Sequence, residues 1–170
     1  MNWVVSVWAG VAVLGFALIF AVPRRTLPWI VVIAIGAHLV RSICLEWGAT
    51  LPTASFVAAI GVGLTAAIVS PVTNQATPIF AFAPVIPLIP GTYMFDALTG
   101  VLALTTGHAN GTSAIVDTAV VDASIATLTI VALAVGAISP TLLVGRHVAR
   151  LLASSPAVSY THLTLPTIYS

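Results

Sequence analysis

The sequence predicts an all-α, polytopic integral membrane protein with about five transmembrane helices, the fourth of them broken by proline and glycine. Only 5% of the 170 residues are charged, 59% are hydrophobic, and the mean hydropathy is +1.15. A soluble domain of this size is about one quarter charged, because it needs a hydrated surface. We therefore expect lipid, rather than water, to surround most of the chain.

Three apolar runs predict the first three transmembrane helices. Residues 3–22 form the first run, which ends where Pro23 stops the helix. Residues 28–45 form the second, and its opening proline and tryptophan suit a first helical turn at a membrane interface. Residues 51–70 form the third, in which a small residue at every fourth position lets another helix approach closely. These small residues are Ser55, Ala59, Gly63 and Ala67.

The remaining apolar sequence predicts one broken helix and one long helix. A proline-flanked loop at residues 71–78 precedes an apolar stretch that extends to Thr105. Four helix breakers rule out one regular helix in this stretch. After a turn at residues 107–111, residues 112–144 predict the fifth helix, bent or ended near Pro140. The four breakers are Pro84, Pro87, Pro90 and Gly91.

The arginines predict how the chain is oriented in the membrane. With five spans and an outside amino terminus, two pairs of arginines fall on one side, which the positive-inside rule makes cytoplasmic. A four-span chain, in which the proline-rich segment only dips into the membrane, would separate the pairs. We therefore expect a multi-pass membrane protein with an outside amino terminus and a cytoplasmic carboxyl terminus. The pairs are Arg24 with Arg25 and Arg146 with Arg150.

Composition also limits the domains and the class of function. We expect one transmembrane domain over residues 1–150 and, because the composition changes to Ser, Thr and Tyr, a disordered or non-native tail over residues 151–170. The chain has no lysine, which argues against nucleic acid as a partner. Its single cysteine, Cys44, and the lack of clusters with metal-ligand spacing predict neither a metal site nor a cofactor. Without a nucleophile beside a base, we expect no enzyme.

His38 and Arg41 place two polar side chains in the second helix, three residues apart and therefore on one face. A charged side chain at the centre of a membrane helix costs about 2.5–3.5 kcal/mol on insertion scales, so Arg41 should face protein, water or an anion. One interpretation is that Arg41 binds a substrate carboxylate while His38, which titrates near neutral pH, carries a coupled proton. The other is that Arg41 reaches the interface, pairs with Glu46 and only orients the helix.

The break in the fourth helix is the second candidate site. Pro87, Pro90 and Gly91 free backbone amides and carbonyls, which protein, water or a ligand must satisfy. Broken helices in transporters hold anionic substrates near the bilayer midplane, at the positive end of a half-helix. Thr92 and Asp96 add a hydroxyl and a carboxylate just beyond the break. The alternative is a proline kink whose freed groups are met by neighbouring helices.

Two aspartates near the start of the fifth helix have a structural and a functional interpretation. Asp117 and Asp122 suit the helix dipole and can be solvated at the outer interface. Asp122 lies deeper, so it is also a candidate proton carrier within the helix bundle.

Several motifs together resemble the threonine/serine exporter family (ThrE-like), and in particular its small, YjjB-like membrane subunit. The resemblance covers roughly residues 10–150, and residues 92–96 depart from the family pattern. The motifs that carry it are FAVPRRTLPW at residues 20–29, Gly36 with His38 and Arg41, Glu46-Trp47, and VIPLIPG at residues 85–91.

The resemblance implies an exporter subunit of a bacterial inner membrane that works with a larger membrane subunit of the same family in a hetero-oligomer. It implies the export of threonine and serine, or of dicarboxylates such as succinate, driven by the proton motive force. All these substrates carry a carboxylate, as the independent interpretation of Arg41 requires. Two other classes stay open, namely a scaffold subunit that transports nothing and a passive channel.

Overall fold

The computed structural model describes residues 3–106 and 112–153, and all regular structure in these ranges is helical, as predicted. The predicted turn at residues 107–111 and all but the first three residues of the predicted tail at 151–170 lie outside the described residues. The elements are α1 (Trp3–Ile19), α2 (Leu27–Glu46), α3 (Leu51–Thr73), α4 (Thr77–Val85), the 3-10 turn η1 (Ile86–Leu88), α5 (Gly91–Thr105) and α6 (Thr112–Ala153).

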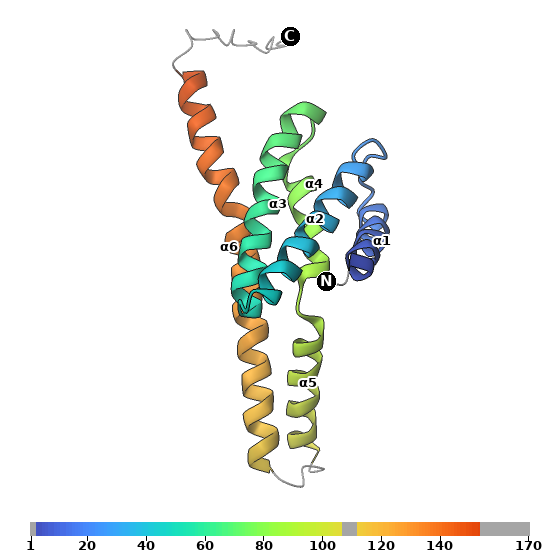
Figure 1. Cartoon of the computed structure of the whole chain (residues 1–170), viewed down its shortest axis with the longest axis vertical. Helices are drawn as coiled ribbons and strands as arrows, with labels where there is room; N and C mark the ends of the chain where they lie inside the picture. Colours follow the sequence, from blue (N-terminus) through green and yellow to red (C-terminus); the bar gives the residue numbers. More distant parts are fainter. Residues whose placement is uncertain (1–2, 107–111, 154–170) are drawn as a thin grey trace, which may run out of the picture.

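Three of these helices are long and apolar enough to cross a membrane, judged over the described residues. They are α2, α3 and the part of α6 from Ser113 to Pro140. The helices on either side of the break, α4–η1 and α5, form a fourth candidate that is bent by 57°. By contrast, α1 has 17 residues, fewer than the roughly 20 that a span needs, and it is seen nearly end-on in the view in which α6 stands upright (Figure 1). The predicted count of about five is therefore approximate.

The turn between α3 and α4 is tighter than predicted. The helix continues through Pro71 to Thr73 and stops at Asn74, which adopts a left-handed conformation with φ of 54°. The Ser70 hydroxyl donates a hydrogen bond to the carbonyl of Gln75 at 2.7 Å and accepts one from Thr77 at 3.0 Å. The predicted loop at residues 71–78 was therefore wrong in its bounds, because these hydroxyls fix a shorter turn.

Helix α6 also passes its proline without ending. Proline has no N–H, so Pro140 leaves the carbonyl of Gly136 without its helical donor. The Ser139 hydroxyl donates to this carbonyl at 3.2 Å, which replaces the missing bond. The helix consequently continues to Ala153, beyond the predicted end at residue 144.

Helices α3 and α6 run in the same direction and pack almost backbone to backbone. A Cβ added to Gly63 would collide with the carbonyl oxygen of Ala137, and one added to Gly136 would lie 2.8 Å from the carbonyl oxygen of Phe56. The predicted small-residue face of the third helix is confirmed by this contact, in which Ala59 also takes part. Close approach of this kind is a common way for membrane helices to associate.

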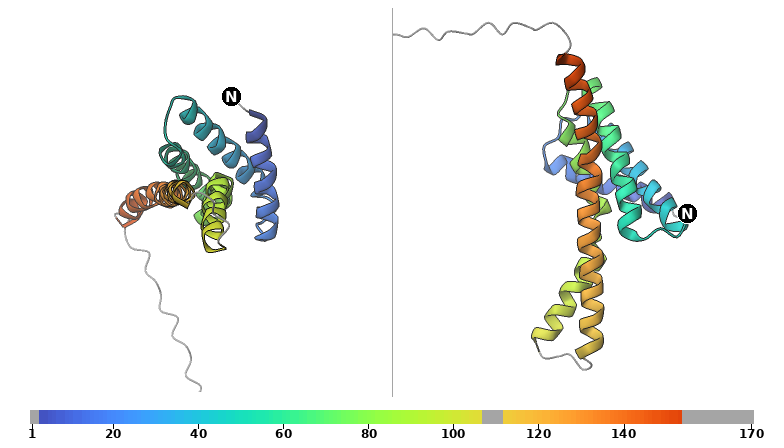
Figure 2. Two further views of the ribbon diagram at one scale, coloured as in Figure 1. Left: turned by 90° about the horizontal axis from the view of Figure 1, so that it is seen from below. Right: turned by 90° about the vertical axis from the view of Figure 1, so that its left-hand side faces the viewer.

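The described residues divide into two parts, which we call the body and the arm (Figures 1 and 2). The buried hydrophobic cluster lies in the body, around Phe80 and Leu88. In the arm, α5 runs antiparallel to the start of α6, and none of its described residues is buried. The break after η1 is where the body meets the arm. The body comprises residues 3–90 and 126–153, and the arm comprises residues 91–106 and 112–125.

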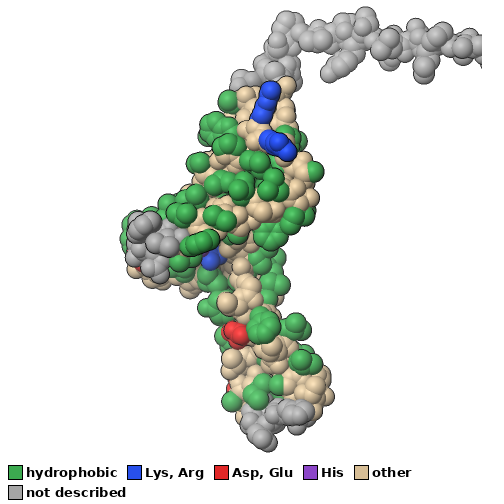
Figure 3. All heavy atoms as spheres, turned by 90° about the vertical axis from the view of Figure 1, so that its right-hand side faces the viewer, with side chains coloured by type: hydrophobic (Ala, Val, Ile, Leu, Met, Phe, Trp, Pro, Cys, Tyr) green, Lys and Arg blue, Asp and Glu red, His purple; other side chains and the backbone are tan. Residues whose placement is uncertain are grey.

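Large apolar side chains cover much of the molecular surface (Figure 3). Trp47 is 84% exposed, Ile19 77% and Phe82 75%. A soluble monomer rarely exposes apolar side chains on this scale, whereas lipid solvates them well. The surface therefore agrees with a membrane environment.

Candidate functional site

Arg41 and the broken helix, the two strongest sequence predictions, meet in the structure. The Nη1 atom of Arg41 donates a hydrogen bond of 2.7 Å to the carbonyl oxygen of Leu88, the last residue of η1. Ile89 then turns the backbone to an extended conformation with ψ of 132°, so the amide of Thr92 cannot reach this carbonyl as it would in a continuous helix. Leu88 is only 1% exposed, and its carbonyl therefore needs a partner from the protein.

His38 makes the corresponding contact to α1. Its Nδ1 atom lies 3.0 Å from the hydroxyl oxygen of Ser6, which is buried at 1% exposure. Within one turn of α2, His38 therefore reaches α1 while Arg41 reaches the break. Ser6 was not predicted, although a lone serine among apolar residues of a membrane helix is a signal that could have found it.

The proline and glycine residues at the break differ in their accessibility. Pro90 is buried and Pro87 is half-buried, whereas Gly91 and Thr92 are exposed. Pro90 is the N-cap of α5, and no side chain among the described residues caps this helix end. The positive end of the α5 dipole therefore opens on an accessible surface, close to the carbonyl that Arg41 contacts.

Asp96 and Asp122 lie on opposite walls of one groove, between α5 and α6 in the arm. The groove has a volume of about 510 Å³, and the side chains of Thr99 and Thr118 line it with them. Asp122 is half-buried, whereas Asp96 and Asp117 are exposed. The structure therefore brings Asp96 and Asp122 together within the arm. Arg41 lies apart from them, where its guanidinium contacts the break that joins the body to the arm.

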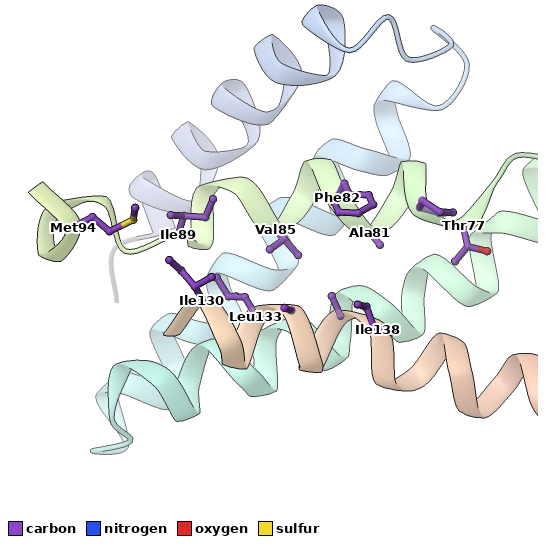
Figure 4. Close-up of a pocket in the computed structure, with 12 residues that line it drawn as sticks. Thr77, Ala81, Phe82, Val85, Ile89, Met94, Ile130, Leu133 and Ile138 are labelled. Atoms are coloured by element: carbon purple, nitrogen blue, oxygen red, sulfur yellow. The ribbon is translucent and has the colours of Figure 1, made fainter. Parts of the chain in front are cut away.

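A second cavity, of about 430 Å³, lies between α4 and α6 on the flank of the break (Figure 4). Val85, Ile89 and Met94 line it on one side, and Leu133 and Ile138 of α6 face them. Its walls are almost entirely apolar. A carboxylate would lose its hydration there without gaining hydrogen bonds, so this cavity does not suit a small anionic substrate.

The fold and this site define a class, that of multi-pass helical membrane proteins with an arginine held at a broken helix. Within this class, residues 5–143 match the family described as threonine/serine exporter, ThrE, and the chain belongs to that family. The resemblance seen in the sequence motifs is thereby confirmed. The family indicates a transporter rather than an enzyme. No solved structure matches the chain.

Proposed function

We propose that this chain is the smaller subunit of a two-component exporter in a bacterial inner membrane. The exporter moves a small carboxylate-bearing metabolite out of the cell, either threonine and serine or a dicarboxylate such as succinate. A larger membrane subunit of the same family completes the transport path, and the proton motive force drives it. The amino terminus lies outside and the carboxyl terminus in the cytoplasm, as the two arginine pairs favour.

The observation that carries the proposal is the hydrogen bond from Arg41 to the carbonyl of Leu88. A guanidinium has five N–H donors in a planar fork that matches a carboxylate, and the bond to Leu88 uses one of its N–H groups. A substrate carboxylate would compete with the Leu88 carbonyl for this donor. The exposed amino end of α5 at Gly91 and Thr92 adds a second attraction for the anion. Substrate binding would therefore free the Leu88 carbonyl at the break from its hydrogen bond to Arg41.

Proton coupling falls to His38 and Asp122 in this proposal. His38 stands one turn from Arg41 and hydrogen-bonds to Ser6, so a change in its charge acts on the neighbouring arginine. Asp122 faces the same groove as Asp96, and carboxylates that share a membrane cavity are suited to exchange protons.

Efflux from vesicles that contain both subunits tests the role of Arg41. Arg41→Ala should reduce threonine or succinate efflux about 10- to 100-fold, which corresponds to a charged hydrogen bond of about 1.5–3 kcal/mol. Arg41→Lys should restore efflux in part, because it keeps the charge and loses the fork. Arg25→Ala is the matched control, since it removes the same charge from an exposed loop. Undiminished efflux by a correctly assembled Arg41→Ala complex would refute the proposal.

A scaffold subunit is the second candidate, because Arg41 already satisfies a backbone carbonyl and can act as a structural tie. The same variants separate the two functions. For a scaffold, Arg41→Ala lowers the yield of the complex but leaves the efflux of each assembled complex unchanged. A passive channel is distinguished by collapsing the proton gradient, which stops a driven exporter and leaves channel flux intact.

A further inference from the structure

The apolar cavity between α4 and α6 lies within the membrane-spanning part of the chain. Its α6 wall belongs to the candidate span Ser113–Pro140, and its α4 wall belongs to the bent pair of helices that begins at Thr77. Thr77 and Ile138 line the cavity near the ends of these two spans, and Ile89 and Met94 line it beside the break (Figure 4). The cavity therefore runs from one edge of the membrane inward to the break, and its surroundings are lipid tails.

Small side chains leave this cavity unfilled. Ala81 of α4 and Ala134 and Ala137 of α6 line it, so no long side chain from these positions reaches across the gap. Its volume is about 430 Å³, and all of its lining residues except Thr77 are apolar. Water does not fill an apolar cavity, because it would lose its hydrogen bonds there. An empty space would deprive the wall atoms of their dispersion contacts. The cavity therefore calls for an apolar occupant.

The volume of the cavity decides between two kinds of occupant. A helix about 10 Å across takes up about 420 Å³ for each turn of about 5.4 Å, so the cavity would hold only a single turn of a partner helix. A cavity of about 150 Å³ holds one benzene ring of six carbons, so one of about 430 Å³ has room for a hydrocarbon of about 17 carbons. This is the size of one acyl chain of a phospholipid.

The cavity is also continuous with the surface that faces lipid. Phe82, Ile138 and Ile89 line it and are 75%, 54% and 43% exposed, whereas Leu133, which also lines it, is only 3% exposed. An acyl chain can therefore enter from the surrounding bilayer and reach a side chain that the outer surface hides. We propose that the cavity is a lipid-binding site, in which one acyl chain of a phospholipid lies between α4 and α6 and fills the gap beside the break. The inference does not depend on the proposed function.

Photolabelling of this chain alone in a bilayer tests the site. The probe is a phospholipid with a diazirine in one acyl chain, and the labelled residues are identified by mass spectrometry. Leu133 should be labelled at least as strongly as Val135, which is 53% exposed two residues further along α6 and does not line the cavity. Labelling that follows exposure, with Val135 far above Leu133, would overturn the inference, because bulk lipid alone would then account for it.

Variants that fill the cavity test the assignment further. Ala134→Phe places a ring of about 150 Å³, about one third of the cavity volume, where the chain would lie. It should lower the labelling of Leu133 about tenfold or more and leave that of Val135 unchanged. Ala81→Phe should do the same from the opposite wall, and Ala123→Phe, on the exposed surface of α6 outside the cavity, is the matched control. Undiminished labelling of Leu133 in both filling variants, folded as judged by circular dichroism, would contradict the lipid site.

Two further preparations distinguish other occupants. Co-expression with the larger subunit should leave the labelling of Leu133 unchanged, whereas its loss would assign the cavity to a segment of that subunit. Removal of residues 154–170 should also change nothing, whereas a gain in labelling would assign the cavity to the end of this chain. Either departure would replace the lipid by a protein segment and refute the inference.

Discussion

The contact between α3 and α6 gives the sharpest test of how this fold is held together. Gly63→Ala adds one methyl group where a Cβ would meet the backbone carbonyl of Ala137 and lie 3.0 Å from the ring of Pro140. Neither neighbour is a flexible side-chain end, so the helices must separate. Overpacking of this kind costs about 1–3 kcal/mol. We expect the free energy of unfolding to fall by that amount.

Gly61→Ala is the matched control for this variant. It makes the same substitution two residues earlier in α3, where no atom lies within 4 Å of the added Cβ. Alanine favours a helix over glycine by about 0.5–1 kcal/mol, so this variant should be unchanged or more stable. Because both variants share this gain, they should differ by the overpacking cost of about 1–3 kcal/mol in a denaturing-detergent titration followed by circular dichroism. Equal stability of both would show that α3 and α6 do not pack backbone to backbone.

Two further variants test single hydrogen bonds in the same titration. Ser6→Ala removes the partner of His38 and should destabilise the protein by about 0.5–1.5 kcal/mol, the usual contribution of one hydrogen bond. Ser139→Ala should cost about 1 kcal/mol, because it leaves the Gly136 carbonyl without a donor beside the proline. Ser124→Ala is the control for both, since its exposed hydroxyl bonds only within its own helix turn. Losses no larger than that of the control would contradict these two assignments.

The sequence predicted features that depend on the order of residues along one helix. The small-residue face of the third span and the break at Pro87–Gly91 follow from spacing and from the chemistry of proline. The partners of the polar side chains could not be predicted in this way. Arg41 meets a carbonyl 47 residues away and His38 a serine 32 residues away, and helical periodicity gives the face of a residue but not its neighbour.

The two prolines that the structure places inside long helices show a further limit. Pro71 and Pro140 were expected to end or bend their helices, because proline removes a backbone donor. Both helices continue, to Thr73 and to Ala153. At Pro140 the hydroxyl of Ser139 supplies the lost hydrogen bond. A rule based on proline alone cannot anticipate such a local substitute.

The backbone-to-backbone contact of α3 and α6 also decides which parts of the protein can move during a transport cycle. Sliding one helix along the other would drive glycine positions into backbone carbonyl groups, which cannot make way by changing a rotamer. The pair therefore behaves as a rigid frame. By contrast, α4 faces α6 across an apolar cavity, and the break that follows it is tied to α2 by the hydrogen bond from Arg41 to Leu88, so we expect any motion to occur at the break rather than between α3 and α6.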